Sequence, residues 1–304
     1  MVSMSARGVA LVLTATTLWG ASGLFMHELI GYGLPPIQLV YYSNALTFVL
    51  LWGGLLVFAP RYLQAPLRSL PALLGVGLCS GVLSFVLYTM AVDLVGVGMA
   101  ILLNYTSPAW VTLLAWRFLG EQVGTRRLLA LASAFLGCAL LARVYDPRAL
   151  GVSVPGILLG LASGITWALV QVLGKRVLEN HHPLTLGAYS TLLGTFVLLP
   201  FQSAPLPVGV EARAWPWLLV LVIGPSLVGP LAFYAGLRLL QAGVVSLLAI
   251  SEVLIGVLLG VLVVHESMDA PQAVGALLVG ASVLSLRPAV PNDPLGPEAL
   301  PARA

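Results

Sequence analysis

One acidic residue lies deep inside an apolar stretch of the chain. Glu252 is the only charged residue between Gly243 and Val264. A charge at the centre of a membrane span costs about 3 kcal/mol even on lenient insertion scales, so such residues usually face a protein interior or a cavity. Burial favours the neutral form of a carboxyl group, which suits it to bind and release a proton or to contact an amine. The alternative is a neutral, hydrogen-bonded carboxyl that only joins helices.

Aromatic and amide side chains in other apolar stretches are candidates to line a binding site with this carboxyl. An apolar pocket with a few placed polar groups suits an amphipathic small molecule. Membrane tyrosines and tryptophans also serve as interfacial anchors, which is our interpretation of Tyr88 and Tyr234 near predicted span ends. The predicted substrate-binding residues are Trp19, Tyr41, Asn44, Asn104, Tyr105, Trp167, Tyr189 and Glu252.

Three prolines interrupt apolar segments. A proline inside a helix removes one backbone hydrogen bond and leaves the carbonyl four residues earlier without its partner. Pro108 lies near the middle of one apolar segment, and Pro225 and Pro230 lie close together in another. Within lipid, the freed carbonyls need a partner from the protein or from cavity water. We therefore predict bent or broken helices at a gate, with a simple packing kink as the alternative.

The segments that carry these residues predict an integral membrane protein. Hydrophobic residues make up 59% and charged residues 8% of the 304 residues, whereas soluble domains carry about 25% charged residues. A membrane span needs about 20 apolar residues. We predict an all-α fold with ten transmembrane helices, at about 8–26, 37–58, 70–92, 97–119, 127–144, 155–174, 184–201, 215–237, 242–264 and 271–286.

Lysine and arginine residues set the predicted orientation, because they are enriched on the cytoplasmic side of membrane proteins. With ten alternating spans and a cytoplasmic N-terminus, eleven of them fall inside and three outside. Both termini are therefore predicted to be cytoplasmic, and the proline-rich segment 288–304 to be a disordered tail. The inside residues are Arg7, Arg61, Arg68, Arg117, Arg126, Arg127, Lys175, Arg176, Arg238, Arg287 and Arg303; the outside residues are Arg143, Arg148 and Arg213.

The two halves of the chain resemble each other. Trp19 recurs as Trp167, 148 residues later, and Glu121 recurs as Glu266, 145 residues later. Because each unit holds five predicted spans, the second enters the membrane from the opposite side. Inverted repeats of this kind are typical of secondary transporters, whose binding site lies near the midplane between the repeats. The predicted five-helix repeats are 1–148 and 149–287.

Three sequence segments carry a resemblance to a known family. LWGASGLF at 18–25 and SPAWVTLLAWRFLGE at 107–121, repeated more weakly as SEVLIGVLLGVLVVHE at 251–266, resemble the drug/metabolite transporter superfamily and its EamA-type members. The resemblance implies an inner-membrane carrier for small metabolites, often an exporter of amino acids or related compounds. Two positions depart from the pattern: Val253 stands where a proline often follows the glutamate, and Asn44 where many members carry a basic residue.

Other function classes find less support in the sequence. Gly20–Gly23 matches the GxSG of intramembrane serine proteases, but that chemistry needs a histidine base in another span, and His27, His181, His182 and His265 all lie at span edges. No nucleotide or metal motif appears, so we predict no cofactor, no metal and no enzymatic activity. The expected partners are a small-molecule substrate and the lipid bilayer, without nucleic acid, for a monomer or weak homodimer. A channel-like facilitator or a membrane sensor is the alternative function.

Overall fold

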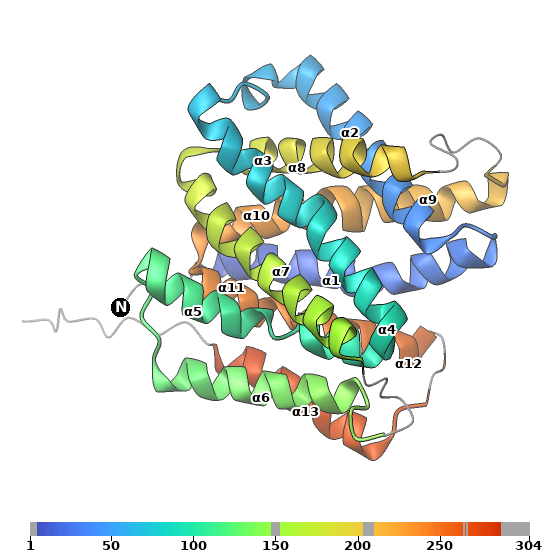
Figure 1. Cartoon of the computed structure of the whole chain (residues 1–304), viewed down its shortest axis with the longest axis vertical. Helices are drawn as coiled ribbons and strands as arrows, with labels where there is room; N and C mark the ends of the chain where they lie inside the picture. The colour runs from blue at the N-terminus through green and yellow to red at the C-terminus, as the bar shows by residue number, and fades with distance from the viewer. Residues whose placement is uncertain (1–4, 147–152, 203–209, 264, 266, 287–304) are drawn as a thin grey trace, which may run out of the picture.

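The computed structural model describes residues 5–146, 153–202, 210–263, 265 and 267–286. Within these ranges the chain forms helices and no strand (Figure 1). Arg148, Glu266, Arg287, Arg303, the boundary between the two predicted repeats and the 288–304 tail lie outside the described residues. The α-helices are α1 (Ala6–Gly31), α2 (Pro36–Phe58), α3 (Leu70–Leu78), α4 (Ser84–Asn104), α5 (Ser107–Leu119), α6 (Thr125–Leu141), α7 (Val154–Asn180), α8 (Pro183–Leu198), α9 (Trp215–Leu221), α10 (Gly229–Leu239), α11 (Ala242–Ala249), α12 (Ser251–Val263) and α13 (Ala270–Ser285).

Local sequence determines where several of these helices begin and end. The Ser153 side chain accepts a hydrogen bond from the Gly156 N–H at the start of α7, and Asp269 forms a capping box with Gln272 at the start of α13. These side chains supply partners for backbone N–H groups that the first helical turn leaves unpaired. At the C-terminal end of α5, Gly120 adopts a φ of 67°. This left-handed conformation, which glycine tolerates, stops the helix.

Seven helical segments of the described chain are long and apolar enough to cross a membrane. One of them, Leu67–Leu119, has 53 residues, which a straight helix would extend over about 80 Å. It turns back at Gly96, whose φ of 79° and ψ of 163° are not helical, and Figure 1 shows the chain running along α3 and α4 and returning along α5. The segment 270–285 is a shorter apolar helix. The count of ten spans therefore stays a prediction.

The two segments that contain predicted proline breaks differ from each other. Pro108 is the second residue of α5, because α4 ends at Asn104 and Tyr105 and Thr106 separate the helices. The apolar segment is thus broken directly before Pro108, which lies in the first turn of α5, where a proline replaces an N–H that has no helical partner anyway. A role of this break as a gate stays a prediction. Pro225, by contrast, lies inside a π-helical turn, Val222–Val228, and Pro230 opens α10. A second π-helical turn, Cys79–Leu83, joins α3 to α4.

Glycines allow the central helices to approach closely. A Cβ atom at Gly156 would lie 2.5 Å from Val95 Cγ1, and one at Gly160 would lie 2.7 Å from the Leu103 side chain. This confirms that the small-residue spacing of α7 serves close packing, here against α4. In the same way α1 packs against α10 and α12. The buried core joins α1, α5, α7, α10 and α11.

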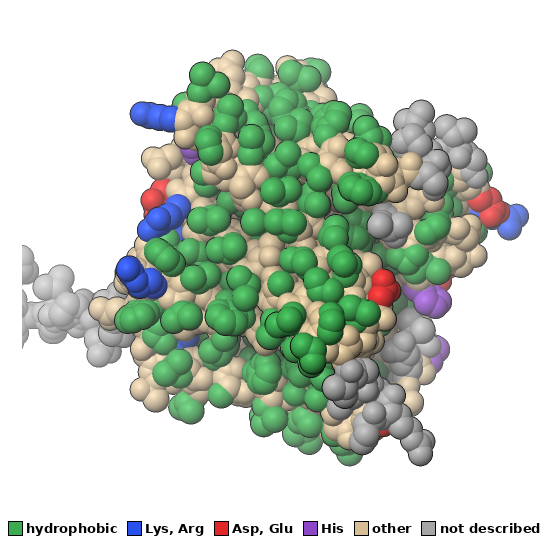
Figure 2. All heavy atoms as spheres, viewed as in Figure 1, with side chains coloured by type: hydrophobic (Ala, Val, Ile, Leu, Met, Phe, Trp, Pro, Cys, Tyr) green, Lys and Arg blue, Asp and Glu red, His purple; other side chains and the backbone are tan. Residues whose placement is uncertain are grey.

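The outer helices complete the bundle. α6 and α13 pair along one edge of the molecule, and α2 and α8 lie at the opposite edge (Figure 1). The face in Figure 2 is covered mainly by hydrophobic side chains, and the lysine and arginine side chains that are visible lie at its edges, most of them at the left. Such an apolar surface with basic ends is what a membrane-embedded protein presents to lipid and water.

We predict that Gly137→Ala destabilises the α6–α13 pair. A Cβ atom at Gly137 would lie 2.7 Å from the Gly275 carbonyl oxygen, which is backbone and cannot rotate away. The free energy of unfolding should fall by about 1–3 kcal/mol, measured by denaturant unfolding in detergent. Gly54→Ala is the control, because nothing lies within 4 Å of its added methyl group. Equal stability of the two variants would contradict the packing seen here.

Candidate functional site

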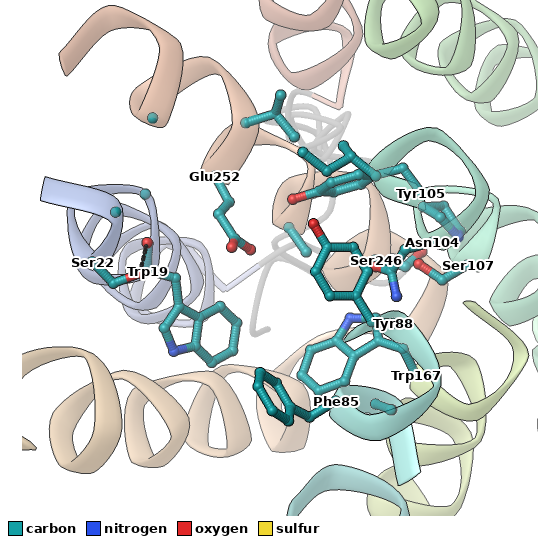
Figure 3. Close-up of a pocket in the computed structure, with 18 of the residues that line it drawn as sticks. Trp19, Ser22, Phe85, Tyr88, Asn104, Tyr105, Ser107, Trp167, Ser246 and Glu252 are labelled. Atoms are coloured by element: carbon teal, nitrogen blue, oxygen red, sulfur yellow. Dashed lines mark hydrogen bonds between the residues drawn. The ribbon is translucent and has the colours of Figure 1, made fainter. Parts of the chain in front are cut away.

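A cavity of about 550 Å³ lies where the broken helices meet, and we call it the central cavity (Figure 3). It receives side chains from α1, α4, α5, α7, α11 and α12. Six residues predicted for the site or gate line it, namely Trp19, Asn104, Tyr105, Pro108, Trp167 and Glu252. The structure thus brings residues from both halves of the chain, more than 200 positions apart, to one place.

Glu252 is the only lining residue of the central cavity that carries a formal charge. It lies in the first turn of α12, after α11 has ended at Ala249. The N-terminus of a helix carries a partial positive charge, which favours a carboxylate at this position. Figure 3 shows the Glu252, Tyr105 and Tyr88 side chains facing the same cavity.

A second helix N-terminus reaches the same cavity. α5 begins at Ser107, which lines the cavity and is 3% exposed. Asn104, at the end of α4, donates from Nδ2 to Ser163 Oγ of α7 at 3.0 Å, and Ser163 donates to the Gly160 carbonyl at 2.7 Å. Asn104 therefore holds the end of α4 against α7, and the partial positive charge of the α5 N-terminus lies beside the cavity.

Trp19 and Trp167 form an aromatic wall of the central cavity, and a third ring, Phe233, packs behind them. The ring centroids of Trp19 and Trp167 are 5.9 Å apart, and Phe233 lies 5.2 Å from Trp19 and 5.7 Å from Trp167. Trp19 Nε1 donates to the Pro225 carbonyl at 3.0 Å. The π-helical turn thus presents a carbonyl group that fixes the orientation of the Trp19 ring, and the ring in turn supports the wall.

A smaller cavity of about 240 Å³ lies on the other side of this wall. Trp19, Ser80 and Trp167 line both cavities, so the aromatic rings separate them. Asn44 and Pro230 line the smaller cavity. The Asn44 amide donates to the Val40 carbonyl at 3.0 Å, so its nitrogen is engaged within its own helix.

Tyr41 and Tyr189 line neither of these two cavities. Tyr41 is 3% exposed and packs against Tyr42 at 6.0 Å in a separate apolar cluster. The Tyr189 hydroxyl donates to the Leu63 carbonyl at 3.1 Å, and its ring packs against Trp52. Both tyrosines pair in the repeat register, but the structure does not bring them to the site that the tryptophans form.

Several lining residues were missed or misread at the level of sequence. Tyr88 lines the central cavity and Tyr234, 4% exposed, lines the smaller one, so the prediction of interfacial anchors is wrong for both. Tyr88 and Tyr234 lie in the first two turns of α4 and α10, each directly after a π-helical turn, and there they face the cavities. A signal existed in the sequence, since Ser80, Ser84 and Tyr88 follow one another at intervals of four and so share one helix face.

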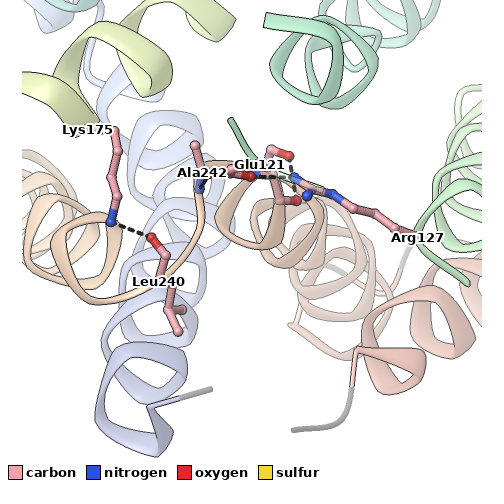
Figure 4. A network of polar contacts seen from close by, with 7 residues as sticks. Glu121, Arg127, Lys175, Leu240 and Ala242 are labelled. Atoms are coloured by element: carbon pink, nitrogen blue, oxygen red, sulfur yellow. Dashed lines mark hydrogen bonds and ion pairs between the residues drawn. The ribbon is translucent and has the colours of Figure 1, made fainter. Parts of the chain in front are cut away.

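One end of the bundle is closed by a polar cluster that we call the latch (Figure 4). The Glu121 carboxylate, in the loop after α5, accepts hydrogen bonds from the Ala242 N–H at 2.6 Å and the Gly243 N–H at 3.2 Å. Arg127 lies 3.0 Å from the same carboxylate, with side chains of the pair 9% and 7% exposed. A buried carboxylate is thus neutralised by a guanidinium and by the N-terminus of α11.

Further cationic side chains join the latch to neighbouring helices. Lys175 Nζ, near the end of α7, donates to the carbonyls of Leu237 at 2.8 Å and Leu240 at 2.7 Å, at the end of α10. Arg176 donates to the Phe118 carbonyl at the end of α5. These bonds satisfy carbonyl groups that a helix C-terminus leaves unpaired. The latch therefore connects α5, α7, α10 and α11 at one end.

Basic residues gather at this end. Arg61, Arg68 and Arg176 line a surface basin together with His181 and His182, between the α2–α3 and α7–α8 connections. Burial and the nearby Arg238 and Arg61 lower the pKa of His182, which lies in the connection between α7 and α8. The basin therefore carries positive charge mainly on its arginines.

The central cavity is closed towards the latch. Ser246 of α11 is 1% exposed, whereas Gly23 of α1, at the other end of the lining, is exposed to solvent. The central cavity and the basic basin have no described lining residue in common. Gly23 thus marks an exposed part of the cavity lining, whereas Ser246 marks a buried part.

The chain shares its sequence pattern and its fold with known proteins. The sequence model of the EamA-like transporter family matches residues 6–143 and again residues 154–287. The chain belongs to the EamA-like transporter family. Membership in this family, part of the drug/metabolite transporter superfamily, confirms the resemblance found in the sequence and indicates a transporter rather than an enzyme.

Individual relatives of this EamA-like protein are also transporters. An uncharacterized transporter of Archaeoglobus fulgidus is 28% identical, with 91% of this chain and 95% of the relative covered. The inner membrane transporter YicL of Salmonella typhimurium is 25% identical, with coverage of 91% and 94%. The pseudopaline exporter CntI of Pseudomonas aeruginosa is 23% identical, with coverage of 92% and 95%. A protein of known crystal structure, 18% identical, superposes with a TM-score of 0.77 over 92% of this chain and 96% of its own, which supports the fold.

We predict that Glu121→Ala strongly destabilises this EamA-like protein. The substitution leaves the Arg127 guanidinium and two N–H groups of α11 buried without their acceptor. The free energy of unfolding in detergent should fall by about 3 kcal/mol or more. Asp269→Asn is the control, because Asp269 and Arg143 are 40% and 46% exposed at 3.6 Å, and such surface pairs contribute less than about 1 kcal/mol. Similar losses in both variants would contradict a buried latch.

Proposed function

We propose that this protein is a secondary transporter that moves small amphipathic metabolites, such as amino acids and related compounds, by alternating access. The observation that carries the proposal is the central cavity, in which Glu252 is the only formally charged lining side chain and aromatic rings form the walls. A concave apolar site with few placed polar groups is the usual form of a small-molecule site.

The two ends of the cavity wall suit opposite charges on one substrate. The Glu252 carboxylate would contact an ammonium group, and the N-terminus of α5 at Ser107 would face a carboxylate group. Trp19 and Trp167 would cover an apolar side chain and also stabilise a nearby ammonium group through their ring faces. A substrate with an amine, a carboxyl and an apolar part fits all three features.

Glu252 is also the group that we propose for proton coupling. A carboxyl in a mainly apolar cavity can alternate between the neutral and the ionised form as its surroundings change. Proton uptake from one side would then be exchanged for substrate, which is consistent with an exporter. The CntI relative is named an exporter, and we extend only the direction of transport, as a proposal, to this chain.

The proposed architecture is ten spans in two inverted five-helix repeats, with boundaries near 148 and 287. The turn at Gly96 divides the 53-residue segment into two lengths, and α6 and α13 are apolar helices of 17 and 16 residues. Each half holds one π-helical turn, Cys79–Leu83 and Val222–Val228, followed by a broken helix, α4–α5 and α11–α12. These paired features support the repeat.

The latch end would face the cytoplasm of a cell's inner membrane. Support comes from the basic residues around the basin at that end and from the positive-inside rule. The relative YicL is described as an inner membrane transporter. In this orientation the central cavity opens to the outside and the latch closes the inside.

A channel-like facilitator is the alternative, and the closed latch favours a carrier. A channel needs one path open at both ends, whereas a carrier opens one end at a time. The test starts with a thermal-shift screen of purified protein against amino acids, amines and nucleosides. The compound with the largest shift is then loaded inside proteoliposomes. Uptake of its labelled form accelerated by unlabelled compound on the far side supports a carrier; uptake without acceleration contradicts one.

We predict that Glu252→Gln removes the pH dependence of transport in the same vesicles. Glutamine keeps the size and the hydrogen-bonding ability of the side chain but binds no proton between pH 5 and 8, so the flux should become constant over that range. Glu28→Gln, an exposed carboxyl at the end of α1, is the control and should keep the wild-type profile. A full pH dependence in Glu252→Gln would rule out its proton role.

A further inference from the structure

Two buried polar side chains below the central cavity lack hydrogen-bond partners in the protein. Gln171 of α7 is 1% exposed, and neither Nε2 nor Oε1 of its amide has a partner among the described residues. Thr112 of α5 is 6% exposed, and its Oγ1 has none either. Burying such groups unpaired is destabilising, so most native structures avoid it. Both groups therefore need an explanation.

Gln171 lies between the cavity and the latch. Trp167, Gln171 and Lys175 are spaced four residues apart, so they fall along one face of α7. At one end of this face Trp167 packs against Phe233 of α10, and at the other Lys175 donates to the Leu237 carbonyl. Gln171 is thus one turn below the aromatic wall, on the line from the central cavity to the closed end.

The relation between the two halves of the chain assigns counterparts to both residues. The offset of 148 residues that pairs Trp19 with Trp167 also pairs Gly23 with Gln171. The offset of 145 residues that pairs Glu121 with Glu266 also pairs Thr112 with Val257. Gly23 and Val257 both line the open central cavity. Gln171 and Thr112 are therefore the counterparts, in the other repeat, of two residues that line the cavity on its open side. They themselves lie on the closed side.

We propose that Gln171 and Thr112 form a second substrate-contact subsite, which is closed in this conformation and lines the cavity when the latch end opens. The inference rests on the proposed alternating access. The subsite offers an uncharged amide and a hydroxyl, which can donate and accept hydrogen bonds, so it takes the hydroxyl, amide or carboxyl group of a substrate. Exposing these groups to water or substrate supplies the partners that they lack here, and this favours opening at the latch end.

Cysteine labelling of the full chain tests the proposal. In a background with Cys79→Ser and Cys138→Ser, which removes both native thiols, Gln171→Cys is compared with Val172→Cys. Val172, 3% exposed, is its buried neighbour, and its counterpart Leu24 does not line the central cavity. Each variant is also combined with Glu121→Gln, which weakens the latch. A membrane-impermeant methanethiosulfonate reagent is added to membrane vesicles from the latch side.

We expect Glu121→Gln to accelerate labelling of Gln171→Cys by about fivefold or more, with Val172→Cys unreactive throughout. Gly23→Cys should label from the opposite side and slow down when the latch is weakened. If Gln171→Cys is labelled no faster than Val172→Cys, the subsite is overturned. Equal acceleration of both variants by Glu121→Gln also overturns it, because the increase in labelling rate would then not be confined to the line from the central cavity to the latch. Counterflow separates the conclusions: intact counterflow with no labelling overturns the subsite alone, whereas absent counterflow overturns the proposed transport and the subsite with it.

Gln171→Met provides a readout that does not depend on labelling. Methionine has a similar volume but no amide, so the closed conformation loses its unpaired groups. The midpoint of thermal unfolding in detergent should rise, and counterflow of the compound found in the ligand screen should slow by about fivefold. A lower midpoint would show that the amide stabilises this conformation and would overturn the proposal.

Discussion

Backbone groups at the ends of broken helices need partners inside an apolar environment, and this constraint organises the structure. In lipid no water replaces a missing helical hydrogen bond. The Glu121 carboxylate receives the first N–H groups of α11, the Lys175 ammonium bonds to the last carbonyls of α10, and the Trp19 indole bonds to the Pro225 carbonyl in the π-helical turn. At these three places a side chain from a distant part of the chain satisfies the backbone groups, and each bond also fixes a wall of a cavity or closes an end.

The same breaks give the site its electrostatic character. Because α5 and α12 begin near the middle of the bundle, two positive helix ends lie beside the central cavity. One of them carries Glu252 and the other carries Ser107, so the two helix ends differ by one ionisable group. This difference allows one end of the cavity to prefer a cation or a proton while the other remains suited to an anionic group.

The two ends of the bundle are unequal in a way that favours a carrier. At the latch the Glu121 carboxylate bonds to Arg127 and to two helix N–H groups, while Gly23, which lines the central cavity, is exposed. Below the aromatic wall the packing contains the unpaired amide of Gln171. The closed end thus combines strong bonds that hold it shut with polar groups that gain partners when it opens, and a balance of this kind allows two conformations of similar free energy.

The sequence alone determined the class of protein and part of the site. The scarcity of charges required apolar helices, and a lone carboxyl in an apolar run identified Glu252, because so costly a residue is seldom without a role. The recurrence of Trp19 as Trp167 correctly placed both at one cavity. Only the tertiary structure decided the remaining assignments. Tyr41 and Tyr189 lie away from the cavity, Tyr88 lines it, and the helix break beside Pro108 falls at Tyr105 and Thr106, which puts Pro108 in the first turn of α5. The physical reason is that a helix between lipid and a protein core is apolar on both sides, so hydrophobic periodicity does not show which face points inward. Helix rotation and the partners of each break, set by contacts between distant segments, make that choice.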